Sequence, residues 1–64
     1  MPKFPNVRIH LGGTENAYEI FERVENAMRQ AGIDPAEFTR YRRAAMAGDY
    51  ENLFRVTRET VNTR

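Results

Sequence analysis

Few side chains in this chain of 64 residues could carry out covalent or acid–base chemistry. The sequence has no cysteine and no serine, and its one histidine is His10. Nucleophilic catalysis normally uses a serine or cysteine beside an activating base, so that arrangement is absent. A zinc site would have to take most of its ligands from carboxylates. We therefore expect no catalytic residue, no metal site and no cofactor, and we expect that the protein is not an enzyme.

The charged residues are chiefly explained as a solvated helix surface with ion pairs one turn apart, and binding is the alternative. Ten basic and nine acidic residues give a net charge of +1, and nine of the ten basic residues are arginine. Arginine suits bidentate contacts with carboxylate and phosphate better than lysine does. Glu25 before Arg29 has the order that favours ion pairs within a helix. Four arginines in the second half of the chain form a candidate surface for nucleic acid or an acidic partner: Arg40, Arg43, Arg55 and Arg58.

An N-terminal strand is predicted over residues 6–12, where apolar and polar residues alternate as they do in a strand with one buried face. Residues 1–5 contain two prolines and are expected to form a flexible arm. No later segment has the pattern of a second strand, and a strand without a partner is unstable. We therefore expect the strand to pair between chains, and the candidate dimer strand consists of Val7, Ile9, His10 and Leu11.

Three helices are predicted after the strand, over residues 14–31, 35–47 and 49–61. In each, apolar residues recur three or four positions apart, which is the spacing of one buried helix face. Tyr50 belongs to the buried face of the third helix in this pattern, and the tail from Asn62 is expected to fray. The chain is therefore predicted to be one small α+β domain, residues 1–64, mostly helical and in the order β-α-α-α.

Local signals indicate where these helices begin and end. Thr14, Asp34 and Asp49 are good N-cap residues, because their short side chains can accept hydrogen bonds from free backbone N–H groups. Pro35 suits the first position of the second helix. Gly32 is expected to end the first helix in a Schellman motif, which needs a residue in the left-handed conformation.

Three segments carry a recognisable set of short motifs: Gly13–Tyr18 (GTENAY), Arg29–Ile33 (RQAGI) and Ala47–Leu53 (AGDYENL). Together they resemble small uncharacterised proteins of bacteriophages and of bacterial genomes with phage-like genes. In that group a strand is followed by G-x-x-G-N-A-aromatic, A-G-hydrophobic and S/A-G-D-Y. This chain departs from the pattern at Thr14-Glu15, and it ends without the aromatic-acidic, strand-like segment that relatives often carry. The resemblance implies a phage-type accessory protein and no particular chemistry.

Two hypotheses of function follow. The first is a small, non-enzymatic, phage-type accessory protein that acts as a protein–protein interaction module, as a homodimer and with an unidentified host or phage protein. The alternative is a small DNA-binding regulator in which the second and third helices form a helix-turn-helix. The net charge near zero makes nucleic acid the less favoured partner.

No apolar stretch approaches the roughly 20 residues that a membrane span needs. We therefore expect no membrane partner and a cytoplasmic location, which is the host cytoplasm if a phage encodes the protein.

Overall fold

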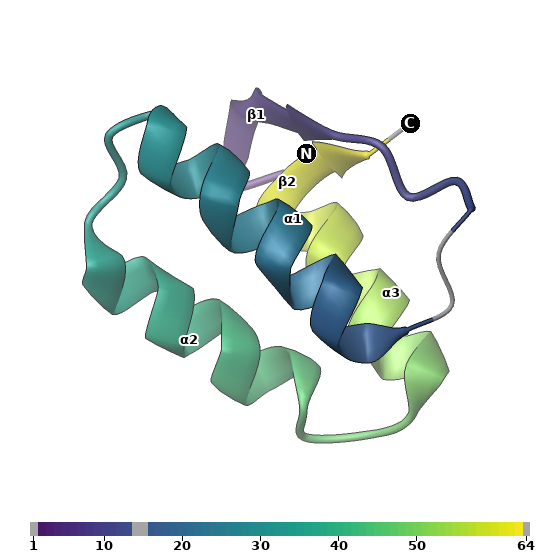
Figure 1. Cartoon of the computed structure of the whole chain (residues 1–64). Helices are drawn as coiled ribbons and strands as arrows, with labels where there is room; N and C mark the ends of the chain where they lie inside the picture. The colour runs from purple at the N-terminus through teal and green to yellow at the C-terminus, as the bar shows by residue number, and fades with distance from the viewer. Residues whose placement is uncertain (1, 14–15, 64) are drawn as a thin grey trace.

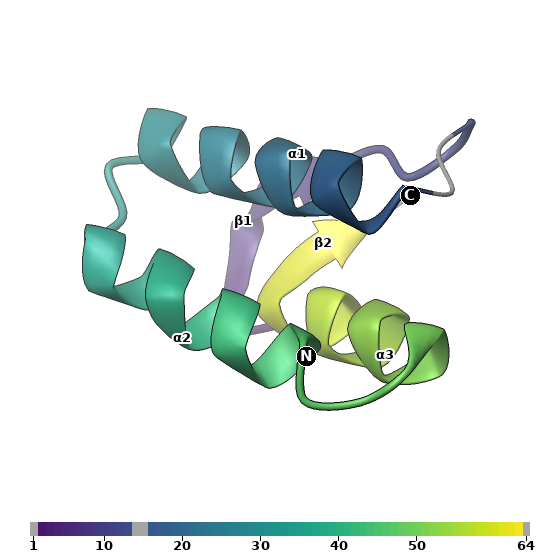
Figure 2. The same ribbon diagram turned by 60° about the horizontal axis from the view of Figure 1, so that its bottom comes forward.

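The computed structural model describes residues 2–13 and 16–63. Its elements follow in the order β1 (Phe4–Ile9), α1 (Ala17–Gln30), α2 (Pro35–Ala45), α3 (Tyr50–Thr60) and β2 (Val61–Thr63). The two strands lie together at one side of the helices, and the start of α1 lies at the same end of the molecule as the start of α3 (Figures 1 and 2). The prediction of a mostly helical α+β domain with one N-terminal strand and three helices is confirmed.

A second strand is present, contrary to the sequence-based prediction. β2 pairs with β1 in parallel, with Phe4 opposite Val61 and Ile9 opposite Thr63. The tail after the third helix therefore does not fray. Three residues are too few to display the alternation by which a strand is recognised in a sequence. Parallel strands need a long crossover connection, and the three helices together supply it.

The prediction of a flexible arm is also wrong for most of residues 1–5. β1 begins at Phe4, and the backbone N–H of Lys3 donates a hydrogen bond to the carbonyl of Glu59 at 2.8 Å. The two prolines do not prevent this, because Pro2 precedes the strand and Pro5 lies where the pairing is irregular, between Phe4 and Arg8. A proline without an N–H group is tolerated where the ladder is interrupted.

The helices begin at the N-caps that the sequence indicates wherever the structure describes them. The side chain of Asp34 accepts a hydrogen bond from the N–H of Ala36 at 2.9 Å, and that of Asp49 accepts one from Asn52 at 3.1 Å. Thr14 lies outside the described residues. The N-cap of α1 is Asn16, so this helix begins later than residue 14.

The C-terminal end of α1 has the predicted Schellman geometry. Gly32 has a φ of +77°, a backbone conformation that glycine adopts without steric cost. The N–H of Ile33 donates to the carbonyl of Met28 at 3.0 Å, and that of Gly32 donates to Arg29 at 3.1 Å. These two bonds satisfy carbonyls that the helix end would otherwise leave free.

The core lies between the strands and the three helices. α1 supplies its centre, because Ile20, Val24 and Met28 are fully buried. Burying an aliphatic side chain of this size stabilises the fold by about 1.5–3 kcal/mol. The other buried apolar side chains come from every remaining element: Val7, Ile9, Phe21, Tyr41, Ala45, Leu53, Val56 and Val61.

One polar contact crosses this core and joins α2 to α3. The hydroxyl of Thr57, which is fully buried, donates to the carbonyl of Leu53 at 2.7 Å. It also lies 2.8 Å from the hydroxyl of Tyr41. A threonine hydroxyl has one proton, so Tyr41 must be the donor in the second bond. Both buried hydroxyls are thereby satisfied.

Replacing Thr57 by valine should destabilise the fold more than replacing Tyr41 by phenylalanine. Thr57→Val leaves the buried tyrosine hydroxyl without an acceptor, at a cost of about 1–3 kcal/mol. Tyr41→Phe leaves Thr57 bonded to Leu53 and should cost about 1 kcal/mol. Urea unfolding of both variants at one protein concentration measures the difference. The reverse order would show that Thr57 is not the acceptor.

The same tyrosine predicts a loss of stability at alkaline pH. Burial raises the pKa of Tyr41 and the negative charge of Glu25 adds to this, whereas the positive charge of Arg42 opposes it. An unfolded tyrosine has a pKa of about 10. Folding therefore favours the neutral form of Tyr41. Its contribution to the free energy of unfolding is fully present below about pH 10 and is lost as the pH rises through the folded-state pKa.

Unfolding measurements between about pH 9 and pH 11 test this expectation. The free energy of unfolding of the wild type should fall more steeply with pH than that of Tyr41→Phe. Parallel profiles for the two proteins would contradict it.

Candidate protein-docking surface

The predicted dimer strand lies in β1 and directly after it. Val7 and Ile9 are buried in the core, Leu11 is half-buried and His10 is exposed. The reason for predicting pairing between chains was the lack of a partner strand, and β2 now fills that role. Pairing of a second copy with the outer edge of β1 stays a prediction.

The outer edge of β1 has features that disfavour such pairing. Pro5 cannot donate a backbone hydrogen bond, and the strand is irregular between Phe4 and Arg8. Just after the strand, the carbonyl of His10 accepts a hydrogen bond from Nη1 of Arg23 at 2.6 Å. Proline and irregular ladders are common devices that protect an edge strand from association.

The four arginines of the candidate basic surface lie in two different environments. Arg40 and Arg55 line one groove between α2 and α3, and both are ion-paired there. Arg40 lies 3.5 Å from Glu37, and Arg55 lies 3.3 Å from Glu59. Both arginines therefore have a carboxylate beside them in this groove, which also contains Lys3.

The other two arginines, Arg43 on α2 and Arg58 on α3, are exposed. Neither has an ion-pair partner within residues 2–13 and 16–63. Arg58 shares a groove on the outer face of α3 with Arg55, together with Asp49 and Glu51. Three of the four arginines, Arg40, Arg55 and Arg58, thus line grooves that also hold carboxylates.

A different surface stands out because it is apolar. Within the part of the chain that the structure describes, three large hydrophobic side chains are strongly exposed: Tyr18 at 70%, Met46 at 60% and Tyr50 at 51%. All three line one groove of about 300 Å³. We call it the apolar groove, and it is also lined by Ala17, Phe21, Ala45, Gly48, Asp49 and Leu53.

The apolar groove forms where three helix ends meet. Tyr18 comes from the first turn of α1, Met46 is the C-cap of α2, and Tyr50 is the first residue of α3. The prediction that Tyr50 faces the core is wrong for this reason. A residue at the first position of a helix can lie beyond the neighbouring elements even when its spacing places it on the buried face.

Aromatic contacts hold the walls of the apolar groove. The ring of Tyr18 lies edge-on to Phe21, with 6.3 Å between ring centroids, and Tyr50 packs on Phe54 at 5.9 Å. Phe21 is 4% exposed and forms the floor. The guanidinium of Arg42 lies 5.3 Å from the centroid of the Phe21 ring. Rings fixed in this way lose little conformational entropy when a partner packs against them.

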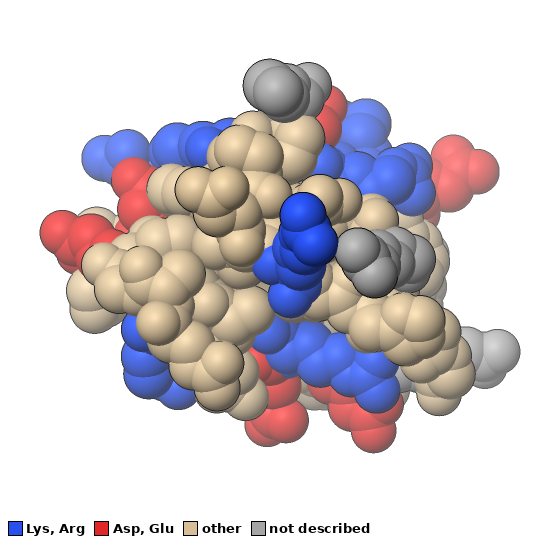
Figure 3. Space-filling view, turned by 90° about the horizontal axis from the view of Figure 1, so that it is seen from above, with Lys and Arg blue, Asp and Glu red and all other residues tan. Residues whose placement is uncertain are grey.

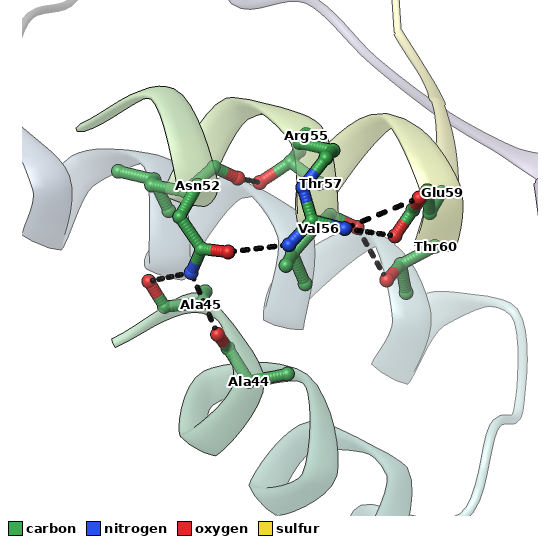
Figure 4. Close-up of polar contacts among 9 residues, drawn as sticks. Ala44, Ala45, Asn52, Arg55, Val56, Thr57, Glu59 and Thr60 are labelled. Atoms are coloured by element: carbon green, nitrogen blue, oxygen red, sulfur yellow. Dashed lines mark hydrogen bonds and ion pairs between the residues drawn. The ribbon is translucent and has the colours of Figure 1, made fainter. Parts of the chain in front are cut away.

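Asn52 fixes the loop that carries Met46 and Tyr50 (Figure 4). Its side-chain amide donates to the carbonyls of Ala44 at 2.9 Å and Ala45 at 3.4 Å, at the end of α2. Its side-chain oxygen accepts from Arg55 at 2.6 Å. A side chain on Gly48 would meet Asn52 at 2.9 Å, so the loop needs glycine at this point.

Charged residues of both signs are close in sequence to the lining of the apolar groove, which itself includes Asp49. Glu22 is one turn after Tyr18 on α1, and Glu51 follows Tyr50 on α3. Arg43 is one turn before Met46 on α2, and Arg58 is one turn after Phe54, which contacts Tyr50. None of these four charges has an ion-pair partner among the residues that the structure describes.

The groove also unites two of the motifs in the sequence. Ala17 and Tyr18 belong to the N-A-aromatic motif, and Gly48, Asp49 and Tyr50 belong to the G-D-Y motif. The two segments are about thirty residues apart in the chain. The third motif, around Gly32, forms the Schellman turn described above and has a structural role.

The described residues contain no group of three or more histidine, cysteine, aspartate or glutamate side chains placed to hold a metal ion. No helix among them is long and apolar enough to cross a membrane. Comparison of the chain with protein-family models, curated proteins and solved structures finds no match. The function must therefore be argued from the surface itself.

Asn52→Ala should destabilise the protein and loosen one wall of the apolar groove. The substitution removes the donor to two helix-end carbonyls, and each such bond contributes about 1 kcal/mol. We expect a loss of about 1–2 kcal/mol in the free energy of unfolding, measured by urea denaturation. Arg55→Ala is the control, since it removes the contact to the other side of the amide and the exposed ion pair with Glu59 but leaves both carbonyl bonds in place. An equal loss in both variants would contradict the role given to the carbonyl bonds.

Proposed function

We propose that the protein is a non-enzymatic protein–protein interaction module and that its docking surface is the apolar groove. The observation that carries the proposal is the clustering of all three strongly exposed large hydrophobic side chains of the described residues in one groove. Single exposed apolar residues are common on protein surfaces, whereas a group of them marks an interaction site. The lack of serine and cysteine favours binding over nucleophilic catalysis.

We propose a second copy of this chain as the occupant of the apolar groove. In a two-fold symmetric dimer the same surface is used by both partners, so it must complement itself. Asp49 is a charged residue of the groove lining, and four further charges without an ion-pair partner among the described residues are near its lining in sequence, namely Glu22, Glu51, Arg43 and Arg58. A two-fold axis through its centre can bring the acidic side of one copy to the basic side of the other.

The size of the domain supports self-association. The described surface covers 4419 Å² in total. A stable interface buries about 800 Å² on each partner, so a dimer centred on the groove would cover about a fifth of that surface. Domains of this length bury little core and often gain stability by association. The phage-type accessory role implied by the motif resemblance is compatible with such a module.

Met46→Lys should convert the dimer to a monomer without unfolding it. Met46 is the C-cap of α2, where a positive charge interacts favourably with the helix dipole. The lysine would nevertheless bring two like charges together in an apolar interface. Sedimentation equilibrium at micromolar concentrations measures the result, and we expect the dimer dissociation constant to rise at least tenfold.

Ala31→Lys is the matched control, because Ala31 is the exposed C-cap of α1 and does not line the groove. It should leave the dissociation constant unchanged. A wild-type protein that stays monomeric at high micromolar concentration would overturn the homodimer. Equal weakening in both variants would show that the apolar groove is not the interface.

Reversing one flanking charge should weaken the dimer, and reversing two should restore it. In the proposed dimer Arg43 of one copy faces Glu22 of the other, so Arg43→Glu makes the two copies repel each other. Glu22→Arg combined with Arg43→Glu exchanges the signs and regenerates a self-complementary surface. We expect the single variant to weaken association several-fold at low salt and the double variant to regain wild-type affinity. Failure of the double variant to recover would contradict pairing of these two sides.

A further inference from the structure

A second groove, between β1 and α1, has a different chemistry. It is shallow and open, with a volume of about 390 Å³, and its lining combines three nitrogen-rich side chains with two carboxamides. No carboxylate lines it, whereas each of the other grooves described above includes at least one. The lining residues are Arg8, Ile9, His10, Arg23, Asn26, Ala27 and Gln30.

Two of its basic side chains are held in place by the fold. Nη1 of Arg23 donates to the carbonyl of His10 at 2.6 Å, which fixes the guanidinium while its remaining N–H groups stay available. The imidazole of His10 lies against Gly12, because a side chain built on that glycine would approach Nε2 to 2.7 Å. Fixed donors lose less entropy when they bind a ligand.

The third basic side chain, Arg8, is exposed and has no ion-pair partner among the described residues. Figure 3 shows the side of the molecule that carries β1. Lysine and arginine side chains occupy the middle and the flanks of this face, and most aspartate and glutamate side chains lie near its outline. The net charge of +1 is therefore unevenly distributed, and an anion is attracted to this face.

The donors are arranged in two rows along the groove. On α1, Arg23, Asn26 and Gln30 follow the spacing of one helix face, which covers about 10 Å over seven residues. On the strand side, Arg8 and His10 are two positions apart and lie on the same face. Rows of donors on both walls suit a ligand with repeated anionic groups better than a single anion.

We propose that this groove binds the phosphodiester backbone of duplex nucleic acid without reading its sequence. Arginine forms paired hydrogen bonds with phosphate oxygens. The groove has no phenylalanine, tyrosine or tryptophan on which unpaired bases could stack, and such stacking supplies much of the affinity for single strands. A length of about 10 Å spans about three phosphates of one strand.

Binding of a fluorescein-labelled 20-base-pair duplex, followed by fluorescence anisotropy at low salt, tests the proposal. Three phosphate contacts predict that the logarithm of the association constant falls linearly with the logarithm of the salt concentration, with a slope of about −2.7. Arg8→Glu should weaken binding at least tenfold and should reduce the steepness of that slope by about 1. Arg8 is exposed and unpaired, so circular dichroism should show an unchanged fold.

Arg40→Glu is the control, because it makes the same change in net charge at a residue outside this groove. It should weaken binding about twofold or less. Stronger loss in Arg40→Glu than in Arg8→Glu would overturn the proposal and favour α2 and α3 as the nucleic-acid surface. Absence of duplex binding by the wild type at low salt would overturn it outright.

Two competitors distinguish the chemistry of the ligand. Inorganic phosphate at millimolar concentration should not displace the duplex, since it occupies only one of several contacts. Displacement would assign the groove to a single phosphate group. Poly-glutamate at equal charge concentration should compete poorly, and equal competition would assign the groove to an acidic protein.

Gly12→Ala provides a variant that keeps every charge. The backbone of Gly12 has no positive φ, so alanine fits the main chain, but its methyl group would displace the imidazole of His10. We expect duplex binding to weaken several-fold with no change in stability. Unchanged binding would exclude His10 from the contact.

Discussion

The parallel pairing of β1 with β2 joins the two ends of the chain, and the arrangement of the helices depends on it. Each strand alone is too short to be stable, and the pair is covered by helices. The side chain of Val61, the first residue of β2, is fully buried against that core. Because the strands run in parallel, α1, α2 and α3 must together return the chain across the length of the sheet. The helix ends that form the apolar groove are thus brought together by a contact between the termini.

The pairing of β1 with β2 removes the reason to expect that β1 pairs with another molecule. A strand without a partner would have to be completed by another molecule, whereas β1 is completed by its own chain. Association then needs a different surface, and the fold provides one where the start of α1, the end of α2 and the start of α3 converge. The exposed rings of Tyr18 and Tyr50 are held there by aromatic neighbours instead of being buried.

Much of this fold could be predicted from local sequence, because caps and glycine turns act within a few residues. Asp34, Asp49 and Gly32 hold the positions that their chemistry indicates. β2 could not be predicted, since its three residues take their conformation from β1 and not from their own pattern. Charge pairing also depended on tertiary structure. The order of Glu25 and Arg29 favours a pair within α1, but Glu25 accepts hydrogen bonds from Arg42 of α2, one of them at 3.0 Å.

The candidate site was only partly visible in the sequence. The motifs that contain Tyr18 and Tyr50 stand out in the chain, but nothing in their spacing shows that they meet. Met46 and Tyr50 have the spacing of core residues, and their exposure follows from their positions at helix ends. The groove between β1 and α1 likewise depends on the alignment of a strand with a helix.

Amide hydrogen exchange at high and low protein concentration tests the central claim most directly, because it reports on both surfaces in the unmodified protein. If the chain closes on itself and dimerises through the apolar groove, amides of β1 and β2 stay equally protected at both concentrations. Amides from Met46 to Tyr50 should then exchange faster on dilution. Loss of protection in β1 on dilution, with no change around Met46, would show that the strand is completed by another molecule and would contradict the account.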